Sequence, residues 1–178
     1  MCIRDRYGIS HPRFEKCTIS VNTNDLGAGV LCHNRVALTL EDCTVASNVG
    51  AGIVARRWSS LDVTECRVAS NSGGGIKIQD YAYGSVTDSE VTGNSGLSGA
   101  GMACLDHSQL DVSGTTIFDN TTTGNGAGLF CDLGSRASVQ NCQFSSNYAG
   151  ADGGGICCLN SSLFAYPVSY THLRAHET

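Results

Sequence analysis

The chain has 178 residues, of which 11 are basic and 16 acidic, and its formal net charge is −5. This balance argues against a nucleic-acid surface, which concentrates Lys and Arg against phosphate, and no apolar run approaches the roughly 20 residues that cross a bilayer. Glycine is abundant, with 22 residues, and proline is scarce, with 2, so the composition favours short strands joined by tight turns. The sequence predicts a single all-β domain without a membrane span or a nucleic-acid partner.

The two ends of the chain are related through the DNA that can encode them. Codons for residues 1–6, read on the opposite strand, encode residues 168–172, and the adjoining bases complete a codon for Pro167. Both ends resemble the mosaic-end adapter that a transposase inserts during sequencing-library preparation, and residues 173–178 read as its continuation. We therefore expect residues 1–6 and 167–178 to be adapter-derived and irregular in structure, and residues 7–166 to be a fragment cut at both ends.

A six-fold repeat occupies almost all of the segment between these ends. Each copy contains an apolar residue, an Asn three positions later, and a Gly-x-Gly that leads into an aliphatic residue. The second glycine of each pair lies 19 residues before the next Asn in all five intervals, and only the Asn-to-glycine distance varies. A constant length everywhere except at one corner indicates stacked rungs that accept insertions at a single turn. The repeated asparagines are Asn22, Asn48, Asn71, Asn94, Asn120 and Asn147.

Three short strands are predicted in each rung, because apolar and small polar residues alternate there with a period of two. The first strand follows the glycine pair and begins at Val30, Ile53, Ile76, Met102, Leu129 and Ile156. The predicted inward pairs of the second strand are Leu38/Leu40, Leu61/Val63, Gly84/Val86, Leu110/Val112, Ala137/Val139 and Phe164/Tyr166. Those of the third strand are Cys17/Ile19, Cys43/Val45, Cys66/Val68, Ser89/Val91, Thr115/Ile117 and Cys142/Phe144.

Asparagines and glycines at the corners have predicted structural roles. Asn tolerates the left-handed backbone conformation at a sharp turn, and stacked Asn side chains can form a hydrogen-bonded ladder. Glycine permits the tight bend into the next strand without a clash at Cβ.

The cysteines fall mainly at two repeat positions, where Ser89 and Thr115, or Ala55 and Ile78, replace them in other rungs. We expect buried free thiols, because disulfides between in-register neighbours are strained and no spacing provides a tetrahedral metal site. Cys157 is predicted to point outward.

The segment from Phe14 to Tyr166 resembles the right-handed parallel β-helix family, the pectate-lyase-like coils. Phe144-Ser-Ser-Asn147 followed by Gly153-Gly-Gly-Ile156 is also similar to the paired motifs of polymorphic outer-membrane autotransporters. The resemblance implies a right-handed parallel β-helix of about six rungs, truncated at both ends, and a secreted or cell-surface location. It does not imply one activity, since such coils occur in lyases, hydrolases, epimerases, adhesins and structural modules.

An active site of the kind found in related enzymes is not expected in this fragment. Related polysaccharide lyases need clustered carboxylates for calcium with an Arg or Lys base, and related galacturonases need three neighbouring acids. Asp62 and Asp111 share one outward column about 9.6 Å apart, the far limit for an inverting carboxylate pair, and no third acid lies beside them. We expect no catalytic centre, cofactor or metal. The alternative is a fragment of a polysaccharide lyase or glycoside hydrolase whose catalytic rungs are missing.

The turn between the first and second strands is the best candidate for a binding site. Stacking places Arg35, Trp58, Tyr81 and His107 in one column, and the polar residues Arg57, Asp80 and Asp106 lie beside it. Aromatic rings next to charged groups can dock a sugar, although a stacked turn that only protects the coil is the structural alternative. Asp80 and Asp106 on neighbouring rungs could instead share a cation or a proton.

The insertions between Asn and glycine give a second candidate surface, a shallow saddle at Val49 and Ser72, where the insertions are missing. Taken together, the sequence predicts a non-catalytic scaffold or adhesin-like section of a larger secreted or cell-surface protein. Its predicted partners are a polysaccharide or glycan and the remaining rungs of the parent protein.

Overall fold

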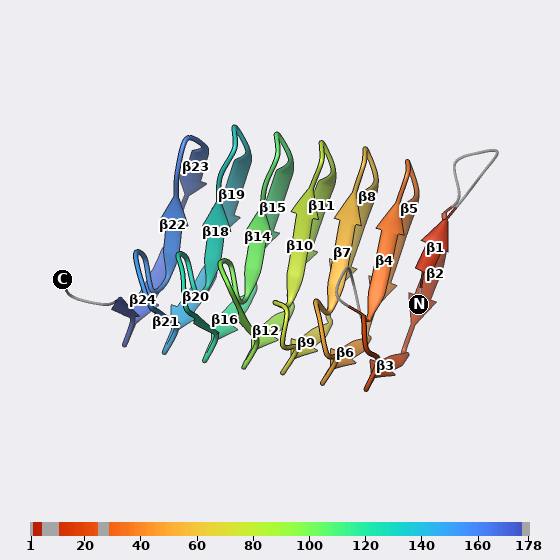
Figure 1. Ribbon diagram of the computed structural model, residues 1–178, viewed down its shortest axis with the longest axis horizontal. Coiled ribbons are helices and arrows are strands. Elements are labelled where there is room, and N and C mark those ends of the chain that lie inside the picture. The colour runs from red at the N-terminus through yellow and green to blue at the C-terminus, as the bar shows by residue number, and fades with distance from the viewer. Residues whose placement is uncertain (1, 5–10, 25–28, 176–178) are drawn as a thin grey trace.

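The computed structural model describes residues 2–4, 11–24 and 29–175, and within them the secondary structure consists of strands and turns. The chain winds into a coil in which each rung adds one strand to each of three seven-stranded sheets (Figure 1). Neighbouring strands within a sheet are parallel and come from successive rungs. The predicted all-β parallel solenoid of about six rungs is therefore confirmed.

Three sheets follow one another around each rung, and a short fourth sheet lies between the third and the first in the later rungs. The first contains β1 (Cys2–Arg4), β4 (Val30–His33), β7 (Ile53–Arg56), β10 (Ile76–Gln79), β14 (Met102–Cys104), β18 (Leu129–Cys131) and β22 (Ile156–Cys158). The second contains β2 (Arg13–Glu15), β5 (Ala37–Glu41), β8 (Ser60–Thr64), β11 (Tyr83–Thr87), β15 (Gln109–Ser113), β19 (Arg136–Gln140) and β23 (Ser162–Ala165). The third contains β3 (Thr18–Ser20), β6 (Thr44–Ala46), β9 (Arg67–Ala69), β12 (Glu90–Thr92), β16 (Thr116–Phe118), β20 (Cys142–Ser145) and β24 (Val168–Thr171). A short fourth sheet, which the sequence analysis did not predict, contains β13 (Ser95–Gly96), β17 (Thr121–Thr122), β21 (Tyr148–Ala149) and β25 (Arg174–Ala175).

The core is a set of inward columns that run the length of the coil. Val30, Ile53 and Ile76 are register partners on consecutive rungs, as predicted, and they are almost completely buried. Inward side chains of neighbouring columns have complementary sizes, as Gly84 and Ile78 show. A Cβ added to Gly84 would lie 2.7 Å from Ile78 Cδ1, so the larger Ile78 fills the space that Gly84 leaves, and close packing is maintained in that rung.

The predicted inward pair of the last rung is wrong by one residue. Leu163 and Ala165 are the partners of Ala137 and Val139, whereas Phe164 and Tyr166 are exposed. The preceding turn explains the shift, because it has one left-handed residue, Asn160, where the other rungs have two. Since successive strand residues face opposite sides, one deleted turn residue exchanges the inward and outward sets.

The tails were predicted to be irregular, and the structure contradicts this for part of them. Cys2–Arg4, Val168–Thr171 and Arg174–Ala175 form β1, β24 and β25, which continue three of the sheets. The Tyr170 ring also stacks on Phe144 at a centroid distance of 5.6 Å. The open edge of a parallel coil can pair with any extended segment of compatible alternation, regardless of its origin.

The asparagine ladder is confirmed. Each Asn Nδ2 donates to Oδ1 of the equivalent Asn in the next rung at 2.9–3.1 Å, from Asn22 through to Asn147. The same Oδ1 accepts the backbone N–H of the preceding Asn, as between Asn71 and Asn94. Nδ2 also donates to a main-chain carbonyl, as from Asn94 to Val68. The buried amides therefore satisfy their hydrogen-bonding groups within the stack.

The predicted left-handed conformation of the asparagines is wrong by one position. The positive φ belongs to the residue before each Asn, for example Ser47 before Asn48 and Ser70 before Asn71. The Asn side chain instead accepts the N–H that follows this bend. The second glycine of each pair is needed for close approach, since a Cβ on Gly75 would lie 2.6 Å from the Gly101 carbonyl oxygen.

The other two corners repeat this arrangement with shorter side chains. Between the second and third strands, the N–H of Cys43 donates to Cys66 Sγ at 3.4 Å, and that of Cys66 to Ser89 Oγ at 3.0 Å. Between the first and second strands, Ser108 Oγ accepts the N–H of Ala82. In each case a left-handed residue precedes the acceptor in the chain. The cysteines from Cys17 to Cys158 are free thiols, as predicted, and at the second corner a γ-sulfur or γ-oxygen is what the position requires.

Replacing a central asparagine should destabilise the whole stack. Asn94→Ala removes the acceptor of two donors on Asn71 and strips the Val68 carbonyl of its partner. We expect a loss of about 2–4 kcal/mol in the free energy of unfolding, because buried groups lose their partners. The half-buried Asn22, at the end of the ladder, serves as the control, and Asn22→Ala should cost less. Urea unfolding of both variants checks this, and equal losses would contradict it.

Cys66 offers a test of the corner rule. Cys66→Ser keeps both the acceptor for the Cys43 N–H and a donor to the Thr64 carbonyl, so its effect on stability should stay within about 1 kcal/mol. Cys66→Ala leaves the Cys43 N–H without its acceptor and should cost about 1–3 kcal/mol. Urea unfolding compares the two variants. An equal loss in both would mean that Cys66 acts only by filling space.

Candidate functional site

The candidate binding turn is built from two consecutive left-handed residues in each rung. They are Asn34 and Arg35, then Arg57 and Trp58, and then the pairs Asp80/Tyr81 and Asp106/His107. Main-chain bonds hold the turns in register, since the N–H of Trp58 donates to the Asp80 carbonyl and that of Tyr81 to the Asp106 carbonyl. The structure thus places all seven predicted residues in two adjacent columns, one mainly aromatic and the other mainly charged.

The aromatic column is a continuous ring stack. The centroids of Trp58 and Tyr81 are 5.8 Å apart with an interplanar angle of 11°, and those of Tyr81 and His107 are 5.2 Å apart at 21°. A Cβ on Gly134 would lie 2.6 Å from His107 Nδ1, so the glycine in the next rung leaves room for the imidazole. The alignment of these residues was predicted from the repeat spacing, and the structure adds the contact between the ring faces.

This stacking limits how a ligand can approach. Tyr81 lies between Trp58 and His107 in the stack, so a ligand meets this part of the column at its ring edges. Trp58 is 61% exposed and Tyr81 55% exposed despite their size. The column therefore presents an apolar strip rather than a pocket.

The charged column beside the rings, formed by Arg57, Asp80 and Asp106, makes no ion pair or side-chain hydrogen bond with the described part of the protein. No group of three or more His, Cys, Asp or Glu in the described ranges is arranged to hold a metal ion. These three side chains are consequently available to a ligand that lies along the aromatic strip.

The two outward aspartates of the second sheet have separate environments. Tyr83 Oη donates to Asp111 Oδ2 at 3.0 Å, and Gln109 Nε2 donates to the same oxygen at 3.2 Å. Partial burial raises the pKa of Tyr83, and the hydrogen bond to Asp111 raises it further. Ser85 separates Asp62 from Asp111 in the register. Asp111 is thus held by neighbours on the sheet surface rather than paired with Asp62.

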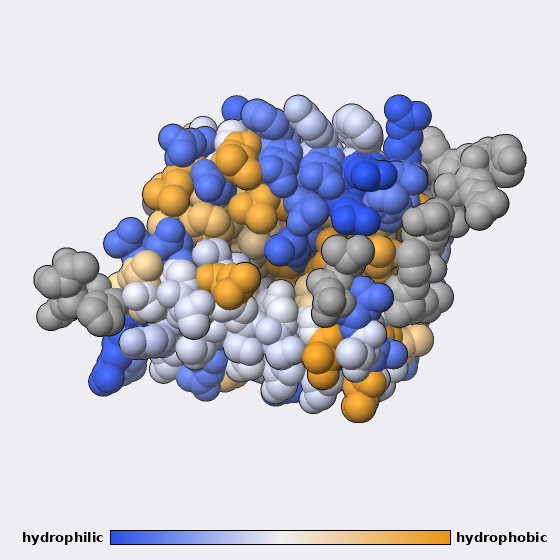
Figure 2. Space-filling view, viewed as in Figure 1, coloured by the Kyte–Doolittle hydropathy of each residue, from blue (hydrophilic) through white to orange (hydrophobic). Residues whose placement is uncertain are grey.

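The predicted saddle is a groove of about 680 Å³ beside the first sheet. Val49 and Ser72, the two residues predicted from the missing insertions, line its shallow side. Leu97 and Thr123, from the insertions of later rungs, line the other side, and Lys77 lies between them on the outward face of β10. Figure 2 shows a broken apolar band on this face, between pale surface and strongly hydrophilic side chains.

The outward column of the first sheet differs from the polar column that faces outward on the second. It is apolar except for Lys77 and contains Leu31, Val54, Ala103, Phe130 and Cys157. Cys157 has the predicted outward direction but is 8% exposed, since the preceding turn covers it: a Cβ on Gly153 would lie 2.8 Å from Cys157 Cβ. The outward column thus forms a second, largely buried apolar layer, which was not predicted from the sequence.

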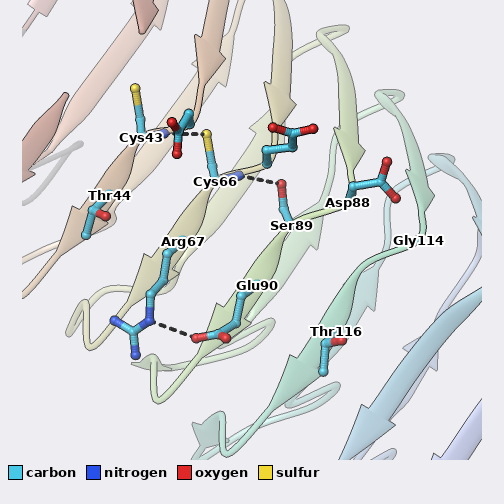
Figure 3. Close-up of a pocket in the computed structure, with 11 residues that line it drawn as sticks. Cys43, Thr44, Cys66, Arg67, Asp88, Ser89, Glu90, Gly114 and Thr116 are labelled. Carbon is cyan, nitrogen blue, oxygen red and sulfur yellow. Dashed lines mark hydrogen bonds and ion pairs between the residues drawn. The ribbon is translucent and has the colours of Figure 1, made fainter. Parts of the chain in front are cut away.

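A third surface lies at the corner between the second and third sheets and was also missed. Asp42, Glu65 and Asp88 occupy equivalent left-handed positions on three consecutive rungs. Figure 3 shows these corners with the Arg67–Glu90 ion pair below them, whose Nε–Oε1 distance is 2.8 Å. Each acid is followed directly in the chain by a member of the thiol and hydroxyl ladder of Cys43, Cys66 and Ser89. The arrangement supports the corner, and nothing in it is a nucleophile paired with a base.

Fold and site together define a parallel β-solenoid that carries polar groups on exposed turns. The profile described as right handed beta helix region matches residues 7–166, and the chain therefore belongs to the right-handed β-helix family. No curated protein and no solved structure matches the chain. In the described part of the chain, no helix is long and apolar enough to cross a membrane.

The raised pKa values of two buried thiols predict how the free energy of unfolding depends on pH. Burial raises the pKa of Cys32 and of Cys66 to about 11, from the ordinary thiol value of 9.0. An unfolded chain therefore releases these protons at a lower pH than the folded one, so the stability that the two buried thiols contribute is present below about pH 9 and is lost as the pH rises toward 11. Urea midpoints measured across this range should show the decline. Its slope should decrease in the Cys66→Ser variant, and an unchanged slope would contradict this cause.

Proposed function

We propose that this chain is a non-catalytic, adhesin-like section of a larger secreted or cell-surface protein, and that its aromatic turn binds glycans. The observation that carries the proposal is the exposed strip of Trp58, Tyr81 and His107 beside charged groups without protein partners. Large rings that remain exposed on a rigid coil are suited to contact with the apolar edge of a sugar.

The geometry favours a glycan that lies along the coil axis. Such a chain crosses the ring edges of successive rungs, which are about 4.8 Å apart. Arg57, Asp80 and Asp106 then hydrogen-bond its hydroxyl groups from the neighbouring column. Because the backbone turns are held in register by hydrogen bonds, binding requires little rearrangement.

Affinity at a single turn is expected to be weak. A shallow strip buries only part of a ligand and offers few convergent polar groups. Many rungs of a longer parent chain would supply avidity by presenting several turns at once. This is the behaviour of an adhesin-like scaffold rather than that of a substrate pocket.

A glycan panel tested against wild type and Trp58→Ala decides the proposal. We expect wild type to bind with millimolar to high micromolar Kd, and Trp58→Ala to lose at least about fivefold, because one aromatic contact contributes roughly 1 kcal/mol. Tyr148→Ala, which removes an exposed ring elsewhere, is the matched control and should retain binding. Circular dichroism establishes that both variants are folded. Binding that is absent, or that both variants retain equally, returns the turn to a structural role.

The enzymatic alternative predicts a different result. A lyase or hydrolase section would place additional outward acids on neighbouring rungs of the complete protein, next to Asp62 or Asp111. Recovery of the complete reading frame tests this directly. An outward cluster of acids with an Arg or Lys on one face would favour the enzyme, and a surface anchor or translocator would favour the adhesin.

A further inference from the structure

The groove beside the first sheet is lined by apolar side chains together with hydroxyl groups and Lys77. This mixture differs from both the apolar core and the polar outer face of the second sheet. The lining of the groove includes the half-buried Leu105 and the buried Phe130. The Leu97 side chain stands at its rim and is 84% exposed. An apolar side chain so exposed, next to a recessed apolar surface, is typical of a binding edge.

Lys77 places a single positive charge in the same groove. Its register partners on the adjacent rungs are Val54 and Ala103, and both are buried. Within the described ranges no carboxylate lies at ion-pair distance from Lys77 Nζ. The groove thus combines an unneutralised ammonium with an apolar surface and the hydroxyls of Ser72 and Thr123.

The position of the groove follows from the variable corner. Only one residue separates Asn48 from Gly50 and Asn71 from Gly73, whereas the following rungs have insertions that form β13 and β17. The short corners leave the outward face of β10 open, and the insertions build a wall beside it. Glycine also allows the short corners of neighbouring rungs to approach closely, since a Cβ on Gly73 would lie 2.6 Å from the Ala51 backbone nitrogen.

We propose that this groove binds small amphiphilic organic anions, with the acidic group on Lys77 and a flat apolar body against Leu105 and Phe130. The volume of about 680 Å³ lies within the range of small-molecule sites. A single ammonium favours one carboxylate, sulfate or sulfonate, and the partly apolar surroundings strengthen the pairing relative to open water. The site is separate from the aromatic turn, and its test is independent of glycan binding.

The probe is 8-anilinonaphthalene-1-sulfonate, and N-phenyl-1-naphthylamine is the matched compound without the sulfonate. Fluorescence titration of the 178-residue chain should give saturable binding of the sulfonate. Lys77→Met, which keeps the length of the side chain, should weaken this binding about five- to tenfold through loss of a charge-assisted contact. The affinity of Lys77→Met for the neutral amine should stay within about twofold of the wild-type value, because that compound carries no charge. Lys77→Arg should retain most of the affinity for the sulfonate.

Two controls separate this site from general adhesion to the coil. Lys16→Met removes a lysine at a distant corner and should change neither titration. Leu97→Ser, at a highly exposed position, should preserve the fold and weaken both compounds, because each lies against the same apolar rim. The proposal is overturned if Lys77→Met binds the sulfonate as wild type does, if it weakens both compounds equally, or if Lys16→Met has the same effect as Lys77→Met.

Discussion

Each rung of this coil must turn three corners, and at each corner a left-handed residue breaks the main-chain ladder. The N–H that follows the bend is then satisfied by a side chain of the next rung: Asn at one corner, Cys, Ser or Thr at another, and, from Ala82 onward, Ser at the third. An unpaired buried N–H would cost about 1–3 kcal/mol in every rung. Where the ladder is continuous, as along the asparagines, the corner side chains therefore hold the strands in register, and the apolar core depends on that register.

The same constraint explains what the sequence could predict. The Asn repeat and the alternation of apolar residues define the rung length, and for this reason the columns of Val30, Ile53 and Ile76 were predicted correctly. The inward pair of the last rung could not be obtained from the repeat spacing, because one turn residue is missing before Leu163. Periodicity cannot detect a deletion at a corner when both possible registers place apolar residues inward.

Corner chemistry was only partly visible in the sequence. The exchange of Cys with Ser89 and Thr115 suggested a small buried site, whereas hydrogen bonding shows that a γ-heteroatom is required. Similarly, the alignment of Trp58, Tyr81 and His107 was predictable from spacing, but the occupation of their faces by one another was not. Ring orientation depends on side-chain torsions that rung spacing does not determine.

Both candidate binding surfaces lie where residues or insertions can change while the corner hydrogen bonds are kept. The aromatic turn occupies left-handed positions whose side chains point away from the core, so rings and charges can be exchanged there at little cost to stacking. The groove arises because the third corner accepts insertions after its ladder residue, and two rungs without them uncover Lys77. A lysine among apolar register partners would be disfavoured under a covering insertion. The short corners and the charge are therefore mutually dependent, and lengthening the corner at Ser72 should bury Lys77 and destabilise the coil unless the lysine is replaced as well.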